Sequence, residues 1–212
     1  MQNWTREQMA RRLAADIPEG AVVNLGIGLP TLVANHLDPD REVVLHTENG
    51  LFGMGPAPAP GEEDPDLVNA GKQPVTALPG ASFFHHGDSF AMMRGGHIDI
   101  CVLGAFQVSA RGDLANWSTG APGAIPAVGG AMDLAVGARN TWVMMEYLAR
   151  DGSCKIVRDC SYPLTAVACV DRVYTDVAVL EFADGTLRVL DMAPGWDLDA
   201  LQRVTPVQLA RG

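Results

Sequence analysis

The chain has 212 residues, of which 48% are hydrophobic and 19% are charged, and its formal net charge is −10. A chain of this length can bury a sizeable core without disulfides or metal ions, and it fits one α/β domain over residues 1–212. The acidic balance argues against nucleic acid and anionic membranes as partners, because both repel a negatively charged protein.

The first predicted element is a helix that begins after Thr5. Thr5 and Gln8 have the spacing of a capping box. Met9, Leu13 and Ile17 then recur at helical intervals. This stretch lacks the apolar segment and cleavage site of a signal peptide, and no apolar run approaches the ~20 residues that span a membrane. The four cysteines show no CxxC motif and no Cys/His ligand spacing, so we expect reduced, buried thiols and a cytoplasmic protein.

A strand, a helix and a second strand follow in succession. Residues 21–25 form an apolar run that enters the glycine loop 26–28, and Pro30 suits the first turn of a helix that continues over residues 31–37. Residues 42–46 form another strand-like run, which ends at Glu48. This succession is typical of a βαβ unit and predicts a parallel sheet.

Further elements are predicted downstream. Residues 55–66 form a Pro/Gly/acid loop without periodicity, and a long loop of this kind is more often functional than a linker. Strands are predicted at 98–106 and 141–146, with a loop leading into a helix at 129–138. The alternation on both sides of Asp184-Gly185 predicts a β-hairpin, and a short helix follows at 197–204. We therefore expect an α/β fold with an open, mostly parallel sheet flanked by helices, and mixed β structure toward the C-terminus.

Glu48 is the most informative single residue. Its neighbours in the stretch 45–55 are mainly glycines and bulky apolar residues, where an unpaired carboxylate is costly. It follows a predicted parallel strand, at the sheet edge where open α/β folds bind their ligands, and Asn49-Gly50 can form a turn that presents it. Three roles are open to it: a structural salt bridge or cap, a general base, or a nucleophile.

Other candidate stretches are less specific. The loop 26–30 and the glycines at 129–130 can offer backbone N–H groups to an anion or oxyanion, or can be tight turns only. Asn116 is either a turn residue or a positioned amide. His85 and His86 are adjacent and point in different directions, and no further ligand completes a set, so we expect no metal. The residues alone indicate a small-molecule enzyme with a parallel sheet.

Four ordered blocks resemble the β subunits of the 3-oxoacid CoA-transferases. They are residues 46–56 (HTENGLFGMGP), 69–76 (NAGKQPVT), 90–117 and 129–134 (GGAMDL), and the likeness covers nearly the whole chain. Family members usually carry Ser-Glu-Asn-Gly, whereas this chain has Thr at position 47, which keeps the hydroxyl. Residues 55–73 and 118–133 are more similar to the 3-oxoadipate branch than to the acetoacetate branch. Ala127 replaces a glycine of the acetoacetate type, a change that would suit a second carboxylate on the substrate.

The resemblance implies a fold shared with ribose-5-phosphate isomerase, and it implies roles for named residues. Glu48 would attack succinyl-CoA and pass through a mixed anhydride to a glutamyl–CoA thioester, which then transfers CoA to a 3-oxo acid. Glutamate is ionised at neutral pH, so this attack needs no general base, and each step forms an oxyanion. By resemblance, Asn116 and the N–H groups of Gly130 and Ala131 are candidate oxyanion donors, and Lys72 is a candidate contact for the bound substrate.

Partners and substrates are also implied by the resemblance. No tightly bound cofactor is expected, because the CoA thioester is itself a substrate. An α subunit would carry much of the CoA site, commonly in an α2β2 assembly, and the apolar composition agrees with a large interface. The expected acceptor is 3-oxoadipate, in the β-ketoadipate pathway of aromatic catabolism. The alternatives are acetoacetate as acceptor, a non-catalytic ligand-sensing module, and a sugar-phosphate isomerase or deaminase that uses acid–base chemistry.

Overall fold

Ten strands form one sheet in a computed structural model that describes residues 1–123, 125–126 and 128–212. Ala127, linked above to the acyl pocket, lies outside the described residues. The centre of the sheet is parallel, in the spatial order β10 (Val170–Tyr174), β8 (Asn140–Met144), β5 (Ile100–Leu103), β1 (Val22–Leu25) and β2 (Val44–Thr47). The predicted open, mostly parallel sheet is confirmed, and the predicted βαβ unit joins β1 to β2.

Antiparallel pairs extend the sheet on both sides of this centre. Beyond β2 lie β3 (Leu51–Met54) and β4 (Ala77–Phe83), and beyond β10 lie β11 (Ala178–Ala183), β12 (Thr186–Met192) and finally β13 (Leu209–Arg211), which pairs with β12 in parallel. The predicted hairpin joins β11 to β12 through Asp184 and Gly185. Both have positive φ (52° and 70°), as a two-residue turn between twisted strands requires.

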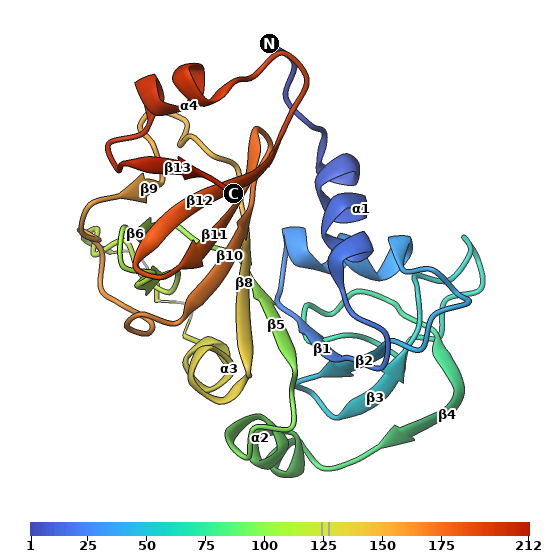
Figure 1. The fold of residues 1–212 in the computed structure, drawn as a ribbon. Coiled ribbons are helices and arrows are strands. Elements are labelled where there is room, and N and C mark those ends of the chain that lie inside the picture. Colours follow the sequence, from blue (N-terminus) through green and yellow to red (C-terminus); the bar gives the residue numbers. More distant parts are fainter. Residues whose placement is uncertain (124, 127) are drawn as a thin grey trace.

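The central strands are buried on both faces because successive side chains point to opposite sides. In β5, Ile100 and Val102 enter the core beneath α1 (Arg6–Asp16), whereas Cys101 and Leu103 enter the core beneath α3 (Ala131–Gly137). α1 begins at the predicted capping box, with Thr5 and Gln8 bonded reciprocally. Figure 1 shows α1 beside the β1 and β2 end of the sheet and α3 near β5 and β8.

The connection between β1 and β2 is a 3-10 helix, η1 (Leu29–His36), which corrects the helix expected over 31–37. Pro30 has no N–H to donate, and Thr31 bonds to the Gly28 carbonyl through both its backbone N–H (3.1 Å) and its hydroxyl (2.7 Å). These contacts with the residue three positions earlier select the tighter 3-10 turn.

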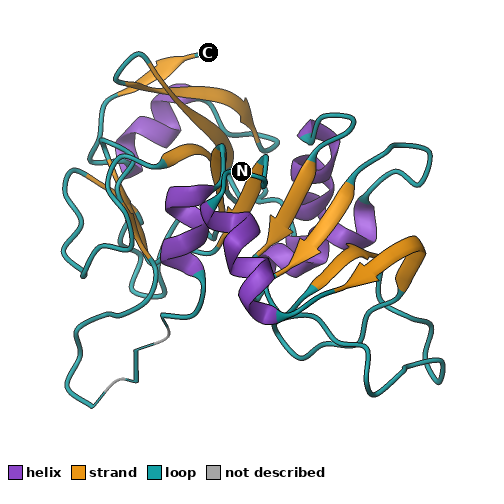
Figure 2. Cartoon of the chain, turned by 90° about the horizontal axis from the view of Figure 1, so that it is seen from below, coloured by secondary structure: helices purple, strands orange, loops and turns teal. Residues whose placement is uncertain are grey.

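Helices α2 (His86–Arg94) and α3 pack against each other below the sheet. Gly137 of α3 leaves no space for a side chain, because a methyl there would overlap the Met93 carbonyl of α2. Seen from below, strands lie on both sides of this central pair of helices (Figure 2). A third short helix, α4 (Leu198–Val204), is capped by Asp197 as the sequence predicts near the C-terminus.

The remaining structure is mostly irregular. β7 (Leu114–Ala115), β6 (Gln107–Ser109) and β9 (Ile156–Val157) form a small second sheet. The predicted irregular loop 55–66 belongs to a longer connection from β3 to β4. Of the four cysteines, Cys101 is buried and the other three are only half-buried. None of the helices in the described part of the chain is long and apolar enough to cross a membrane.

Candidate active site

A cavity of about 760 Å³ lies at the carboxyl ends of the central parallel strands. The segments that follow the strands line it: residues 26–29 after β1, Glu48 after β2, residues 104–106 after β5 and residues 145–146 after β8. The start of α3, at residues 128–131, closes another side. This is the edge where open α/β sheets bind their ligands.

The turn that carries Glu48 is held by its neighbours. Thr47 accepts a hydrogen bond from the Leu51 N–H through its hydroxyl (3.1 Å), which closes the turn between β2 and β3. Gly50 has a φ of 109°, and a side chain there would overlap the Phe84 carbonyl. The amide of Asn49 donates to the Val68 carbonyl (2.9 Å), so the turn is also tied to the β3–β4 connection. The predicted turn is confirmed, and the Thr47 hydroxyl has a structural partner.

A buried polar chain fixes the strand end just before Glu48. The Asn24 amide lies 2.9 Å from Nδ1 of His46, and Nε2 of His46 lies 3.0 Å from the Ser89 hydroxyl, which donates to the Thr47 carbonyl (3.2 Å). Because an amide nitrogen only donates, Nδ1 is the acceptor and Nε2 carries the proton. Burial lowers the pKa of His46 from 6.5 to about 4, so the ring is neutral at neutral pH.

The half-buried Glu48 carboxylate faces the start of α3. A methyl built on Gly130 would overlap the Glu48 carboxylate and would lie 3.2 Å from the Phe90 ring. None of the ion pairs among residues 1–123, 125–126 and 128–212 involves Glu48. A salt-bridge role for Glu48 therefore has no support in the described residues, and the carboxylate is directed into the cavity wall beside Gly130.

Asn116 lines the same cavity, next to β7. Its amide oxygen accepts a hydrogen bond from the Thr165 hydroxyl (2.6 Å), and its Nδ2 donates to the Gly104 carbonyl (3.1 Å). Nδ2 carries two hydrogens, so one remains for another acceptor. Of the two possibilities left open by the sequence, the positioned amide is the one observed.

The other predicted site residues differ in placement. Gly130 caps α3 without a side-chain partner, and the Ala131 N–H makes only a long contact with the Val128 carbonyl (3.4 Å). Both residues line the cavity. Lys72 does not: it is exposed, with a φ of 62°, in the turn next to Gln73, which does reach the wall. The structure thus brings together Glu48 and three of the four other candidates.

Three charged residues of the wall were not anticipated from the sequence. Arg6 of α1 pairs with Glu146 after β8 (2.8 Å), and Lys155 precedes β9. These positions are far apart in sequence and meet only through the folded sheet. No motif or spacing identifies them.

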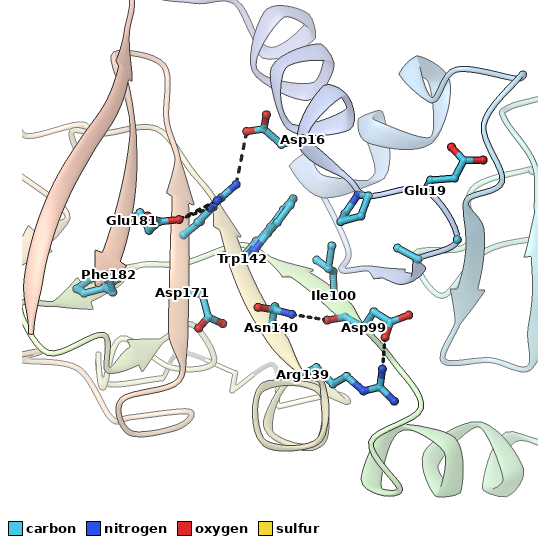
Figure 3. Close-up of a pocket in the computed structure, with 14 residues that line it drawn as sticks. Asp16, Glu19, Asp99, Ile100, Arg139, Asn140, Trp142, Asp171, Glu181 and Phe182 are labelled. Atoms are coloured by element: carbon cyan, nitrogen blue, oxygen red, sulfur yellow. Dashed lines mark hydrogen bonds and ion pairs between the residues drawn. The ribbon is translucent and has the colours of Figure 1, made fainter. Parts of the chain in front are cut away.

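A second cavity, of about 830 Å³, opens at the amino ends of the parallel strands (Figure 3). Its charged residues satisfy one another: Arg172 lies over the Trp142 ring and pairs with Glu181 (2.7 Å), and Arg139 pairs with Asp99 (2.7 Å). Despite its size, this cavity holds none of the predicted site residues. The described residues also contain no group of three or more His, Cys, Asp or Glu side chains suited to a metal ion.

Sequence comparisons agree on one family. The family model described as coenzyme A transferase matches residues 6–202. The chain is 64% identical to the B-type subunit of the 3-oxoadipate CoA-transferase of Pseudomonas putida, over 98% of this chain and 97% of the relative. Identity to the protein of the same name from Acinetobacter baylyi is 58%, over 97% and 94%. Identity to the B-type subunit of the succinyl-CoA:3-ketoacid coenzyme A transferase of Helicobacter pylori is 46%, over 96% and 97%.

Solved structures share the fold at low identity. An acyl-CoA transferase from Escherichia coli O157:H7 matches 99% of this chain with a TM-score of 0.72 and 22% identity, and this chain spans 42% of that protein. The glutaconate coenzyme A-transferase of Acidaminococcus fermentans matches 98% of this chain and 86% of its own, with a TM-score of 0.72 and 19% identity.

Proposed function

The chain belongs to the coenzyme A transferase family as a β subunit, and on that premise we propose that it moves CoA from succinyl-CoA to 3-oxoadipate through a glutamyl–CoA thioester on Glu48. The observation that carries this proposal is the position of the Glu48 carboxylate. It lies in the cavity against Gly130 at the start of α3, outside every ion pair of the described residues.

The proposed reaction proceeds by acyl transfer to and from Glu48. A carboxylate oxygen attacks the thioester carbonyl of succinyl-CoA, the C–S bond breaks, and a mixed anhydride and CoA thiolate form. The thiolate attacks Cδ of Glu48, the C–O bond breaks, and succinate leaves behind a glutamyl–CoA thioester. The carboxylate of the acceptor acid attacks the same carbon, and the steps in reverse yield the acceptor's CoA thioester and free Glu48.

Each attack forms an oxyanion that needs positioned donors. The remaining N–H of the Asn116 amide and the backbone N–H groups of Gly130 and Ala131 are the proposed donors, because they belong to residues of the same cavity as Glu48. The 3.4 Å contact of the Ala131 N–H is long enough to be exchanged for a stronger acceptor. Lys72, outside the cavity, is proposed to contact a part of the substrate distant from the reacting carbon.

Both the acceptor and the partner are inferred from the relatives. The proteins that are 64% and 58% identical are named for 3-oxoadipate, whereas the succinyl-CoA:3-ketoacid protein is 46% identical. All three are named as the second of two kinds of subunit, which supports an α-subunit partner that supplies part of the CoA site. We propose an α2β2 assembly, without a tightly bound cofactor and in the cytoplasm.

Substitution of Glu48 tests the mechanism. In the α–β complex, Glu48→Ala and Glu48→Gln should abolish transfer from succinyl-CoA to 3-oxoadipate, because neither side chain supplies a nucleophilic carboxylate. Glu48→Asp should lose at least about 100-fold in turnover, because a carboxylate withdrawn by one methylene is misplaced for attack. Unchanged thermal melting of the complex serves as the folding control, and substantial activity of Glu48→Ala would refute the role of Glu48. Parallel assays with acetoacetate separate the two acceptor acids.

A further inference from the structure

Two cationic side chains of the described residues line the cavity, and their situations differ. Arg6 is largely exposed and already pairs with Glu146 (2.8 Å). Lys155 makes none of the ion pairs among the described residues, and its ammonium only donates to the Ala105 carbonyl at 3.4 Å. Lys155 is therefore the cation of this wall that can take an anionic ligand without breaking an existing pair.

The backbone holds Lys155 in a fixed position. Its N–H donates to the Tyr147 carbonyl (3.0 Å), and its own carbonyl accepts from the Val108 N–H (3.0 Å). Burial lowers the pKa of Lys155, and the more distant carboxylates of Glu146 and Asp176 oppose this only in part. A half-buried ammonium with one long hydrogen bond is stabilised further when an anion binds to it.

Lys155 is also close to the proposed site of reaction. Its ammonium bonds to the carbonyl of Ala105, and the Asn116 amide bonds to the carbonyl of the preceding residue, Gly104. The two side chains thus meet at consecutive peptide groups after β5. An acyl group whose reacting carbonyl lies between Glu48 and Asn116 extends within the same cavity as Lys155.

Charge balance identifies the anion. With Arg6 and Glu146 paired, the wall retains one negative charge, on Glu48, and one positive charge, on Lys155. Both acids of the proposed reaction carry a second carboxylate, and Glu48 repels it. While Glu48 is bound in the neutral anhydride or thioester, the far carboxylate and Lys155 form the balanced pair.

We propose that Lys155 binds the carboxylate at the far end of the acyl group and thereby selects dicarboxylic acyl groups over monocarboxylic ones. This role is a specificity determinant of the same cavity, and it rests on the proposed function. Bound in this way, the far carboxylate is held away from Glu48, so that the reacting carbonyl is the part of the acyl group that approaches the nucleophile.

The test compares two acceptor acids of equal length in the α–β complex. 3-Oxoadipate has the far carboxylate, and 3-oxohexanoate has a methyl group in its place. Lys155→Met, which keeps the length of the side chain, should lower kcat/KM for 3-oxoadipate by about 10- to 100-fold, the range for loss of one charged hydrogen bond. Its kcat/KM for 3-oxohexanoate should stay near the wild-type value. Arg6→Met is the matched control, because it removes the other cation of the wall and should leave the preference between the acids unchanged.

The possible outcomes separate this inference from the proposed function. Equal losses on both acids would show that Lys155 contacts the shared CoA portion or supports the fold, and would overturn the inference, as would an unchanged preference. Lys155→Arg should keep most of the preference, because it retains the charge. A wild-type complex that transfers CoA to neither acid would overturn the proposed function, and the inference with it. Thermal melting and retained turnover of 3-oxohexanoate show whether Lys155→Met is folded.

Discussion

The polar groups around Glu48 are engaged with one another, and its carboxylate stands apart from them. Thr47 closes the turn, Asn49 holds the β3–β4 connection, and Ser89 binds the strand end. These contacts fix the backbone on both sides of Glu48 while leaving its carboxylate out of the ion pairs of the described residues. The Thr-Glu-Asn-Gly sequence is thus a rigid support for one carboxylate.

Gly130→Ala tests the contact between Glu48 and α3. The backbone at Gly130 (φ −87°, ψ 5°) tolerates alanine, but the new methyl group would overlap the Glu48 carboxylate. We expect kcat/KM of the complex to fall about 100-fold, as for other small displacements of a reacting group, with little change in melting temperature.

Gly104→Ala provides the comparison for Gly130→Ala. Gly104 also lies on the cavity wall, but a methyl there would meet nothing within 4 Å. This variant should lose much less activity. Equal losses at positions 104 and 130 would show that the contact with Glu48 is not what makes Gly130 necessary.

The sequence predicts some site residues and not others, for physical reasons. Glu48 can be placed because an apolar strand pattern ends just before it and a turn follows. The importance of Asn116 comes from the resemblance, since its spacing alone left a turn residue open. Lys155 cannot be found from sequence, because its position depends on Tyr147, Val108 and Ala105, which only the fold brings together.

At the scale of elements, β1, β2 and α2 are joined by one buried polar chain. Asn24 belongs to β1, His46 to β2 and Ser89 to α2, and the chain ends on the carbonyl next to Glu48. Buried polar groups that are fully paired resist rearrangement, since breaking one bond leaves its partner unsatisfied. This link holds the site to the middle of the sheet.

The chain through His46 makes stability depend on pH. Below pH 6.5 the unfolded chain takes up a proton on His46, whereas the folded protein does so only near the lowered pKa of about 4. Stability therefore falls as the pH decreases through this window, by about 2 kcal/mol between pH 7.5 and pH 5 for this residue. Urea unfolding of the wild type and His46→Gln at both pH values measures it. An equal loss in both proteins would contradict this role of His46.

Elements with strong local signals are the ones that the sequence predicts correctly. The capping box of α1 and the Asp184-Gly185 hairpin are set by neighbouring residues, and both are confirmed. The 3-10 form of η1 depends on the local bonds of Thr31, and it was predicted incorrectly. α2 and β4 were not predicted: β4 is an exposed edge strand without alternating burial, and α2 carries a weak apolar pattern.

At the scale of the whole molecule, the sheet ends in an open edge. Every residue of β4 is at least partly exposed, and Leu78 and Phe83 present apolar side chains to solvent. Unpaired strand edges are normally covered or blunted in folded proteins. An exposed apolar edge agrees with the proposed α-subunit partner, and the full-length match to named transferase subunits leaves no support for a non-catalytic sensing module.

The requirement for a partner predicts that the purified chain alone is inactive. Without the α subunit it should transfer no CoA from succinyl-CoA to 3-oxoadipate, because the proposed CoA site is incomplete. Addition of the α subunit should restore turnover and form a stable complex in size-exclusion chromatography with light scattering. Appreciable transfer by the chain alone would contradict the two-subunit account.

The most direct test of the central claim is the intact mass of this chain after the α–β complex reacts with succinyl-CoA and then with borohydride. Borohydride reduces a glutamyl–CoA thioester to an alcohol, so the chain should lose one oxygen and gain two hydrogens, and peptide mapping should place the change at Glu48. The Glu48→Gln complex should show no change. An unaltered mass in the wild-type complex, with acyl-CoA in excess and turnover confirmed, would show that Glu48 is not the covalent carrier of CoA.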